Sequence, residues 1–280
     1  EGDIISIDGS SGEVFLGEVP VQPSAVVRYF EVGLEQALSE IADDPDTVGL
    51  VKAVDRLLTH ADSVRRLGVE ANADTPEDAE LARRFGAEGI GLARTEHMFL
   101  GDRRTMVERV ILAESVEEQQ VEYDKLMPLQ KEDFIGILTS MDGLPTTIRL
   151  IDPPLHEFLP DITSLSVKVA VARERGEVNE RDVKLLAAVT RIHEANPMLG
   201  LRGVRLGVVL PGLFDLQMRA IAEAQAECIK RGQNPKAEIM VPLIGSVSEL
   251  HIIRDRGEKI LADVEAEFGV ELGIPIGVMI

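Results

Sequence analysis

Three arginines accompany apolar segments that resemble β-strands, and together they could bind a small anion. A guanidinium group is planar and bonds two oxygens at once, and each charge-assisted hydrogen bond contributes roughly 1.5–3 kcal/mol. If the three segments end at one edge of a parallel sheet, their arginines converge there, and the sequence predicts a site for a compact phosphate or carboxylate. The residues are Arg94 after the run at 89–93, Arg149 within the run at 146–151, and Arg202 beside a weaker run near 200–203.

The same arginines have a structural alternative, because an arginine within an apolar strand is costly to bury without a partner. Glu96, Asp152 and Glu157 lie close to them in the sequence and could form structural ion pairs. Ion-pair networks occur at such strand ends as well as ligand sites do. Both interpretations remain open for any single arginine, whereas three arginines on one face favour the anion site.

The composition argues against several classes of partner. The 280 residues include 29 Lys+Arg and 49 Asp+Glu, a net charge of −20, which disfavours nucleic acid and anionic membrane surfaces. No apolar run approaches the ~20 residues that cross a bilayer, and no signal peptide pattern begins the chain. The single cysteine cannot form an internal disulfide. We therefore expect a cytoplasmic protein that binds neither nucleic acid nor membrane.

From residue 69 onward, short apolar runs alternate with amphipathic helical stretches. This alternation predicts an α/β fold with a parallel sheet covered by helices. Residues 68–280 would supply six strand–helix units of about 36 residues, roughly three quarters of an eight-unit barrel, although an open doubly wound sheet fits equally well. We expect strands at 69–73, 89–93, 146–151, 238–243 and 274–280, a weaker one near 200–203, and helices at 76–85, 178–195, 214–231 and 248–268.

The first 67 residues differ from the rest. Residues 3–19 predict a β-hairpin around a Gly/Ser-rich turn, and two helical stretches follow between residues 24 and 67. An isolated hairpin is marginally stable at best, so we interpret residues 1–20 as the end of an earlier domain and 21–67 as a helical linker. The chain begins without Met and ends within an apolar run, which we interpret as an excised piece of a longer protein.

Residues 86–99, 149–160 and 196–205 resemble the signatures of the pyruvate, phosphate dikinase family. The segments 2–9 and 71–78 fit the same family, so the resemblance covers essentially the whole chain in order. Phosphoenolpyruvate synthase and the phosphotransferase enzyme I share the Arg-Thr-Glu motif at residues 94–96. Both continue differently after the arginine at position 149, so the stretch 152–160 argues against them.

The resemblance implies a reaction that interconverts ATP, phosphate and pyruvate with AMP, pyrophosphate and phosphoenolpyruvate. A phosphohistidine on a swivelling domain carries the phosphoryl group, and a C-terminal TIM-type barrel hosts the pyruvate/phosphoenolpyruvate step with Mg²⁺. It implies that Arg94 and Arg149 bind substrate, and it places Arg202 where related enzymes have another arginine. It also implies that residues 1–20 end the phosphohistidine domain and 21–67 form its linker, and that the family forms homodimers through the barrel.

The resemblance also implies which functional groups lie elsewhere. The motif of the carrier histidine is absent, the Mg²⁺ ligands would follow Ile280, and the catalytic cysteine would lie in the last barrel unit. The acidic neighbours of Cys228 indicate a structural thiol. We expect no catalytic residue within this chain, and weak anion binding without turnover. The remaining alternative is a naturally short, non-catalytic anion-binding module. The five histidines of the chain all lie outside the carrier motif; they are His60, His97, His156, His193 and His251.

Overall fold

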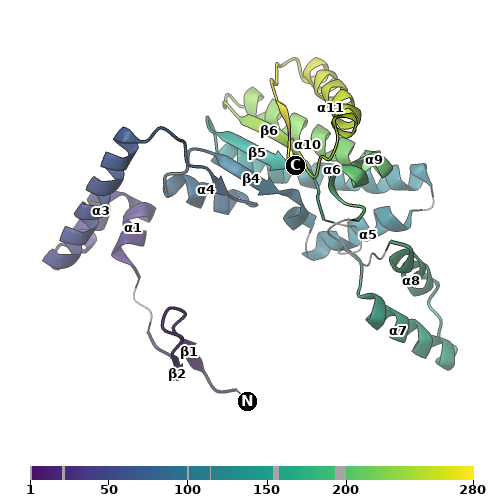
Figure 1. Cartoon of the computed structure of the whole chain (residues 1–280), viewed down its shortest axis with the longest axis horizontal. Helices are drawn as coiled ribbons and strands as arrows, with labels where there is room; N and C mark the ends of the chain where they lie inside the picture. The colour runs from purple at the N-terminus through teal and green to yellow at the C-terminus, as the bar shows by residue number, and fades with distance from the viewer. Residues whose placement is uncertain (1, 21–22, 100, 114, 154–157, 193–199) are drawn as a thin grey trace. The chain divides into compact units, whose positions relative to one another are not determined.

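The computed structural model describes residues 2–20, 23–99, 101–113, 115–153, 158–192 and 200–280 (Figure 1). Two compact units are distinguished, Glu1–Gly68 and Val69–Ile280. The first contains the expected hairpin, in which β1 (Ile5–Ile7) pairs antiparallel with β2 (Val14–Leu16). Its helices are α1 (Ala25–Val32), α2 (Leu34–Glu40) and α3 (Pro45–Val64).

The first of the two helical stretches expected in this unit is divided in the structure. Gly33 has a φ of 84° and separates α1 from α2, because this backbone conformation lies outside the helical region and is accessible to glycine. Helix α3 begins where Asp44 accepts a hydrogen bond from the Thr47 N–H at 3.2 Å, a typical N-cap contact.

The second unit is built on a parallel sheet of five strands, which confirms the predicted α/β class. The strands are in the order β3-β4-β5-β6-β7, which is also their order in the chain. All four neighbouring pairs are parallel, so the carboxyl ends of the strands lie at one edge of the sheet. The strands are β3 (Ala71–Asn72), β4 (Ile90–Arg94), β5 (Pro145–Arg149), β6 (Lys236–Val241) and β7 (Ile276–Val278).

Helices follow the strands, and α10 contacts both α6 and α11. Four alanines of α10 are buried, which lets this helix pack closely against its neighbours. The helices predicted at 76–85, 178–195, 214–231 and 248–268 correspond to α4, α8, α10 and α11. The unit contains α4 (Pro76–Arg84), α5 (Arg104–Leu112), α6 (Val116–Ser140), α7 (Ile162–Arg175), α8 (Glu180–Ile192), α9 (Gly203–Val209), α10 (Pro211–Lys230) and α11 (Val247–Phe268).

The strand predicted near residues 200–203 is wrong. Arg202 is the N-cap residue of α9, and Gly203 begins that helix with a φ of 53°. The Gly203 N–H donates to the carbonyl oxygen of Asp152, and the Val204 N–H donates to that of Pro242, both at 2.9 Å. The segment therefore bonds to the loops that follow β5 and β6 and forms a helix start.

We expect Gly203→Ala to destabilise the second unit more than Gly176→Ala does. Both positions have a positive φ, 53° and 71°, where a side chain costs roughly 1–2 kcal/mol. Only at Gly203 would the new Cβ crowd its surroundings, at 2.8 Å from Leu243 Cβ and 3.0 Å from Asp152 Oδ1, while nothing lies within 4 Å at Gly176. Overpacking adds about 1–3 kcal/mol, so urea unfolding should separate the variants by that amount. Equal losses would contradict the crowding.

Candidate functional site

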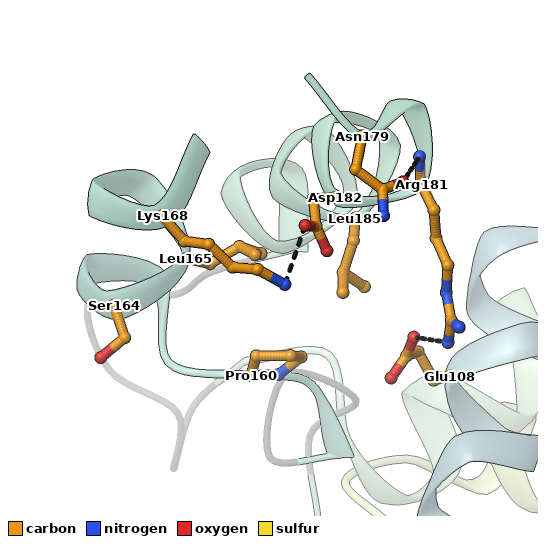
Figure 2. A pocket seen from close by; sticks show the side chains of 9 residues that line it. All are labelled: Glu108, Pro160, Ser164, Leu165, Lys168, Asn179, Arg181, Asp182 and Leu185. Carbon is orange, nitrogen blue, oxygen red and sulfur yellow. Dashed lines mark hydrogen bonds and ion pairs between the residues drawn. The ribbon is translucent and has the colours of Figure 1, made fainter. Parts of the chain in front are cut away.

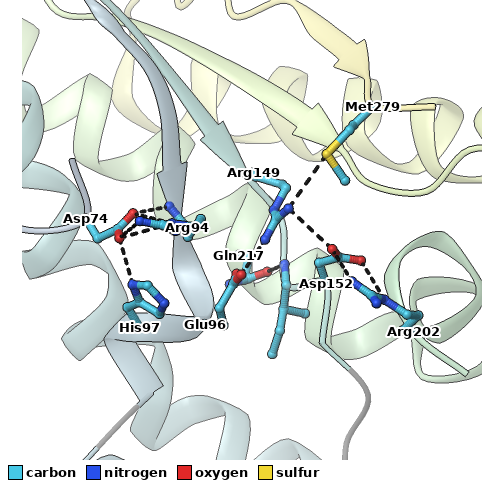
Figure 3. Close-up of polar contacts among 10 residues, drawn as sticks. Asp74, Arg94, Glu96, His97, Arg149, Asp152, Arg202, Gln217 and Met279 are labelled. Carbon is cyan, nitrogen blue, oxygen red and sulfur yellow. Dashed lines mark hydrogen bonds and ion pairs between the residues drawn. The ribbon is translucent and has the colours of Figure 1, made fainter. Parts of the chain in front are cut away.

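The carboxyl ends of β4 and β5 bring Arg94 and Arg149 into register. Each is the last residue of its strand, and their Cα atoms are paired across the ladder. Residues paired in this way project on the same side of a sheet. Their guanidinium groups nevertheless bind different carboxylates, as Figure 3 shows.

Arg149 lies between two carboxylates. Its Nη2 pairs with Glu96, and its Nη1 lies 3.3 Å from Asp152 Oδ2. The side chain of Arg149 is 12% exposed, so both contacts are largely screened from water. Arg149 Nη1 also lies 3.7 Å from the sulfur of Met279. The two structural pairings considered from the sequence, with Glu96 and Asp152, are therefore both present for this arginine.

Arg202 reaches the same carboxylate from the start of α9. Its Nη2 lies 2.6 Å from Asp152 Oδ2 and its Nε donates to Oδ1 at 3.2 Å, a two-point contact that matches the guanidinium fork. The side chain of Asp152 is 4% exposed. Asp152 thus joins Arg149 and Arg202, although 50 positions separate Asp152 from Arg202 in the sequence.

Arg94 belongs to a second cluster, centred on Asp74. Its Nη2 lies 2.8 Å from Asp74 Oδ2, and its backbone N–H donates to Asp74 Oδ1 at 2.7 Å. His97 Nδ1 lies 2.7 Å from the same carboxylate. Figure 3 shows this cluster on one side of Arg149 and the Asp152–Arg202 pair on the other. The structure therefore brings Arg149 and Arg202 together and holds Arg94 on a different partner.

Hydrogen bonding keeps Asp74 ionised. Partial burial acts to raise the pKa of this carboxyl, but the hydrogen bonds from the Arg94 side chain and backbone and from His97 outweigh it, and the pKa lies below its ordinary value. The bond to Asp74 in turn raises the pKa of Arg94. Asp74 was not among the residues predicted from the sequence, although it stands one residue beyond the expected strand at 69–73, a position typical of functional side chains in parallel α/β folds.

Three buried polar atoms at this edge of the sheet lack a hydrogen-bond partner among the described residues. They are Thr95 Oγ1, Glu96 Oε2 and Arg149 Nε. A buried polar atom without a partner costs about 1–3 kcal/mol, so a ligand that supplies the missing partners gains that amount in binding. The Thr95 hydroxyl and the Arg149 Nε–H are donors that an oxyanion would satisfy.

The remaining candidates from the sequence have other roles or lie outside the described residues. Cys228 is fully buried in α10, and burial raises the pKa of its thiol, which supports a structural role. His60 and His251 are exposed. His156, Glu157 and His193 lie outside the described residues.

Metal sites in proteins are built from clustered His, Cys, Asp and Glu side chains. Within the described ranges, no group of three or more His, Cys, Asp and Glu side chains is placed to hold a metal ion. Glu96 and Asp152 are both engaged by arginine. Within the same ranges, no helix combines the length and the apolar character that crossing a membrane requires.

A separate hollow of about 440 Å³ lies between α5, α7 and α8 (Figure 2). Two of the residues that line it are cations, and both are paired. Lys168 Nζ lies 2.8 Å from Asp182, and Arg181 Nη2 lies 2.7 Å from the buried Glu108. The hollow is lined by one guanidinium group, whereas three stand near the strand ends, so the strand ends offer more of the planar forks that bind a compact anion at two points.

Comparison with known proteins finds a family and several relatives. The family described as PEP-utilising enzyme, PEP-binding domain, matches residues 49–280. The chain is 44% identical over 281 residues to pyruvate, phosphate dikinase 1, chloroplastic, of Arabidopsis thaliana, covering 100% of this chain and 26% of that protein. It is 41% identical to the pyruvate, phosphate dikinases of Entamoeba histolytica and Giardia intestinalis, covering 30% and 28% of them and all of this chain. The chain thus spans less than a third of these relatives.

We expect Asp74→Asn to lower the free energy of unfolding at pH 7 by about 1–3 kcal/mol, because Arg94 loses its ionised partner. The folded pKa of Asp74 is depressed, so its contribution is present above the ordinary pKa near 3.9 and is lost as the pH falls through the lower folded value. In urea unfolding between pH 7 and 3, the unfolding free energies of the wild type and Asp74→Asn should begin to converge below about pH 4.

The matched control for this prediction is Asp263→Asn, an exposed position on α11. Its unfolding free energy should stay within about 0.5 kcal/mol of the wild-type value at every pH. If the unfolding free energies of Asp74→Asn and the wild type differ by the same amount at every pH down to 3, the stabilising role of the ionised Asp74 carboxylate is contradicted.

Proposed function

Because the chain belongs to the PEP-binding domain family of PEP-utilising enzymes, we propose that it contributes the pyruvate/phosphoenolpyruvate site of a pyruvate, phosphate dikinase. The similarity to these dikinases confirms the resemblance found in the sequence. The proposed activity of the longer protein interconverts ATP, phosphate and pyruvate with AMP, pyrophosphate and phosphoenolpyruvate. The chain covers 26–30% of the relatives, so this reaction is proposed for the whole protein and anion binding for the part described.

One observation supports this proposal above the others: Arg149 and Arg202 meet on a single carboxylate at the carboxyl end of β5. Phosphoenolpyruvate carries a carboxylate and a phosphate on a three-carbon frame, and two adjacent guanidinium groups suit such a compact anion. Arg149 also retains an unused Nε–H, and the side chain of Arg94 is 38% exposed and accessible from the same edge. We assign substrate binding to these three arginines.

The charge balance determines how the anion would bind. Three guanidinium groups contact three carboxylates, those of Asp74, Glu96 and Asp152. A substrate oxygen can accept from the unused Arg149 Nε–H, but at the guanidinium nitrogens that form ion pairs it must share or replace a carboxylate contact. Two oxygens of a phosphate can bridge Arg149 and Arg202 with the same fork geometry that Asp152 uses, which makes a compact dianion a better competitor than a single carboxylate.

The chemistry of the proposed reaction suits fixed arginines. Pyruvate becomes an enolate before it accepts a phosphoryl group, and preorganised cations stabilise the charge that develops on its oxygen. Phosphoryl transfer depends on positioning and charge neutralisation, and an arginine stays protonated throughout. Mg²⁺ remains part of the proposal for the longer protein, where it would neutralise further charge. We assign none of the described residues to it.

The order of the sheet supports the barrel interpretation. A doubly wound sheet reverses its strand order at a switch point, whereas β3 to β7 follow the chain in one direction. We propose that residues 68–280 form about six of the eight units of a TIM-type barrel, that residues 1–20 end a phosphohistidine domain, and that 21–67 link the two. The proposal includes that domain as the phosphoryl donor, a homodimer, and a cytoplasmic location.

Isothermal titration of the 280-residue chain with phosphoenolpyruvate, in the presence of Mg²⁺, tests the proposal. We expect saturable binding that Arg149→Lys weakens about 10-fold or more, because lysine keeps the charge but loses the second hydrogen bond. The matched control is Arg181→Lys in the hollow between α5 and α8, where the affinity should not change. A wild-type chain that does not bind phosphoenolpyruvate would contradict the proposal, and equal affinities of the two variants would contradict the role of Arg149.

A further inference from the structure

Two buried glutamines lie between the helices that cover the sheet. Gln130 of α6 is 1% exposed and Gln217 of α10 is 0% exposed, and these two helices pack against one another. A buried amide is costly unless its oxygen and nitrogen both find partners. Both glutamines therefore need hydrogen-bond partners inside the protein.

The two amides connect distant segments of the chain. Gln217 Oε1 accepts the Ile151 N–H at 2.8 Å, and Gln217 Nε2 donates to Gln130 Oε1 at 3.0 Å. Gln130 Nε2 lies 3.5 Å from the sulfur of Met98, a weaker acceptor. The connection runs from the loop after β5, through both helices, to the 3₁₀ turn after β4 at Thr95–Phe99.

Both ends of this connection lie within two residues of charged side chains of the anion site. Ile151 stands two residues after Arg149 and one before Asp152, and Met98 stands two residues after Glu96. Because Glu96 also pairs with Arg149, the amides and the ion pair close a ring of contacts around the two segments that carry the charged side chains. A shift of either segment therefore strains a contact in the other.

Gln217 acts where the sheet ladder stops. The Leu150 N–H still donates to the carbonyl oxygen of Met240 on β6, at 3.0 Å. The next amide, that of Ile151, is bound by the Gln217 side chain instead of a neighbouring strand. The orientation of the Leu150–Ile151 peptide, one peptide before that of Asp152, thus depends on a side chain 66 positions away in the sequence.

We propose that Gln217 is a positioning residue for the anion site, which sets the Ile151 peptide and through it the Asp152 carboxylate that joins Arg149 and Arg202. The inference rests on the proposed function, since it names the residue that orders the same site. It acts through the backbone and touches no substrate. Loss of its hydrogen bond to the Ile151 N–H should lower the affinity for the anion, in addition to any loss of folding stability.

The same helix offers a matched control in Gln225, two turns further on. It is 2% exposed, its Oε1 accepts the Ala237 N–H at 2.8 Å, and its Nε2 donates to the Leu272 carbonyl at 2.6 Å. Ala237 lies near the amino end of β6, at the edge of the sheet opposite the arginines. Gln225 therefore makes the same kinds of bonds as Gln217 without contact to the site.

The experiment compares Gln217→Leu with Gln225→Leu in the 280-residue chain. Leucine keeps most of the volume and removes the hydrogen bonds, so both variants should lose thermal stability. Only Gln217→Leu should weaken phosphoenolpyruvate binding, by about 10-fold, and only this variant should speed hydrogen exchange at the Ile151 amide by a comparable factor. In Gln217→Glu, burial favours the protonated carboxyl, which can accept the Ile151 N–H and donate to Gln130 Oε1. This variant should therefore restore most of the affinity and protection, and it serves if the leucine variant does not fold.

The outcomes separate this inference from the proposed function. If the wild-type chain does not bind phosphoenolpyruvate, the proposed function fails, and the positioning role is decided by hydrogen exchange. Faster exchange at Ile151, Asp152 and Arg202 in Gln217→Leu, but not in Gln225→Leu, supports it. The inference is overturned if both leucine variants weaken binding equally, if Gln217→Leu leaves the affinity unchanged, or if exchange at Ile151 is the same in both.

Discussion

Two guanidinium groups, those of Arg149 and Arg202, share the carboxylate of Asp152. The surrounding strands and helices hold the three side chains close enough for this contact. Arg149 and Arg202 would repel one another in a partly buried setting, and the carboxylate between them offsets that repulsion. A buried ion pair must recover the cost of removing its charges from water, which requires close geometry and further hydrogen bonds. Gly203 supplies part of that geometry, since it donates its N–H to the Asp152 carbonyl and leaves no Cβ against the carboxylate.

The sheet and the helices contribute different parts of this arrangement. Parallel pairing places the ends of β4 and β5 side by side and so brings Arg94 and Arg149 to one edge. The chain then leaves that edge after Asp152, forms α7 and α8, and returns at Arg202. The Asp152–Arg202 ion pair therefore joins the residue that precedes this long segment to the residue that follows it. The buried Gln217 binds the backbone next to Asp152.

The ion pairs also bear on the proposed chemistry. A site in which every guanidinium group already contacts a carboxylate is ordered before the ligand arrives, so less conformational entropy is lost on binding. The same contacts impose a competition, because substrate oxygens must share or displace carboxylate oxygens. A compact ligand with two anionic groups meets that competition better than a monocarboxylate, which agrees with phosphoenolpyruvate as the proposed ligand.

The sequence by itself determined the α/β class, the positions of the five strands and of α4, α8, α10 and α11, the three arginines and the family, because periodicity and motifs depend on neighbouring residues. It did not predict α5, α6, α7 or α9. It did not reveal that residues 200–203 begin a helix, because Gly203 takes its conformation from bonds to Asp152 and Pro242 on distant loops. Nor could spacing identify Asp74 or Gln217 as partners, since a hydrogen bond across 20 or 66 positions leaves no local pattern. Only the tertiary structure decided which carboxylate each arginine binds, because that choice depends on where separate strand ends and helix starts meet in space.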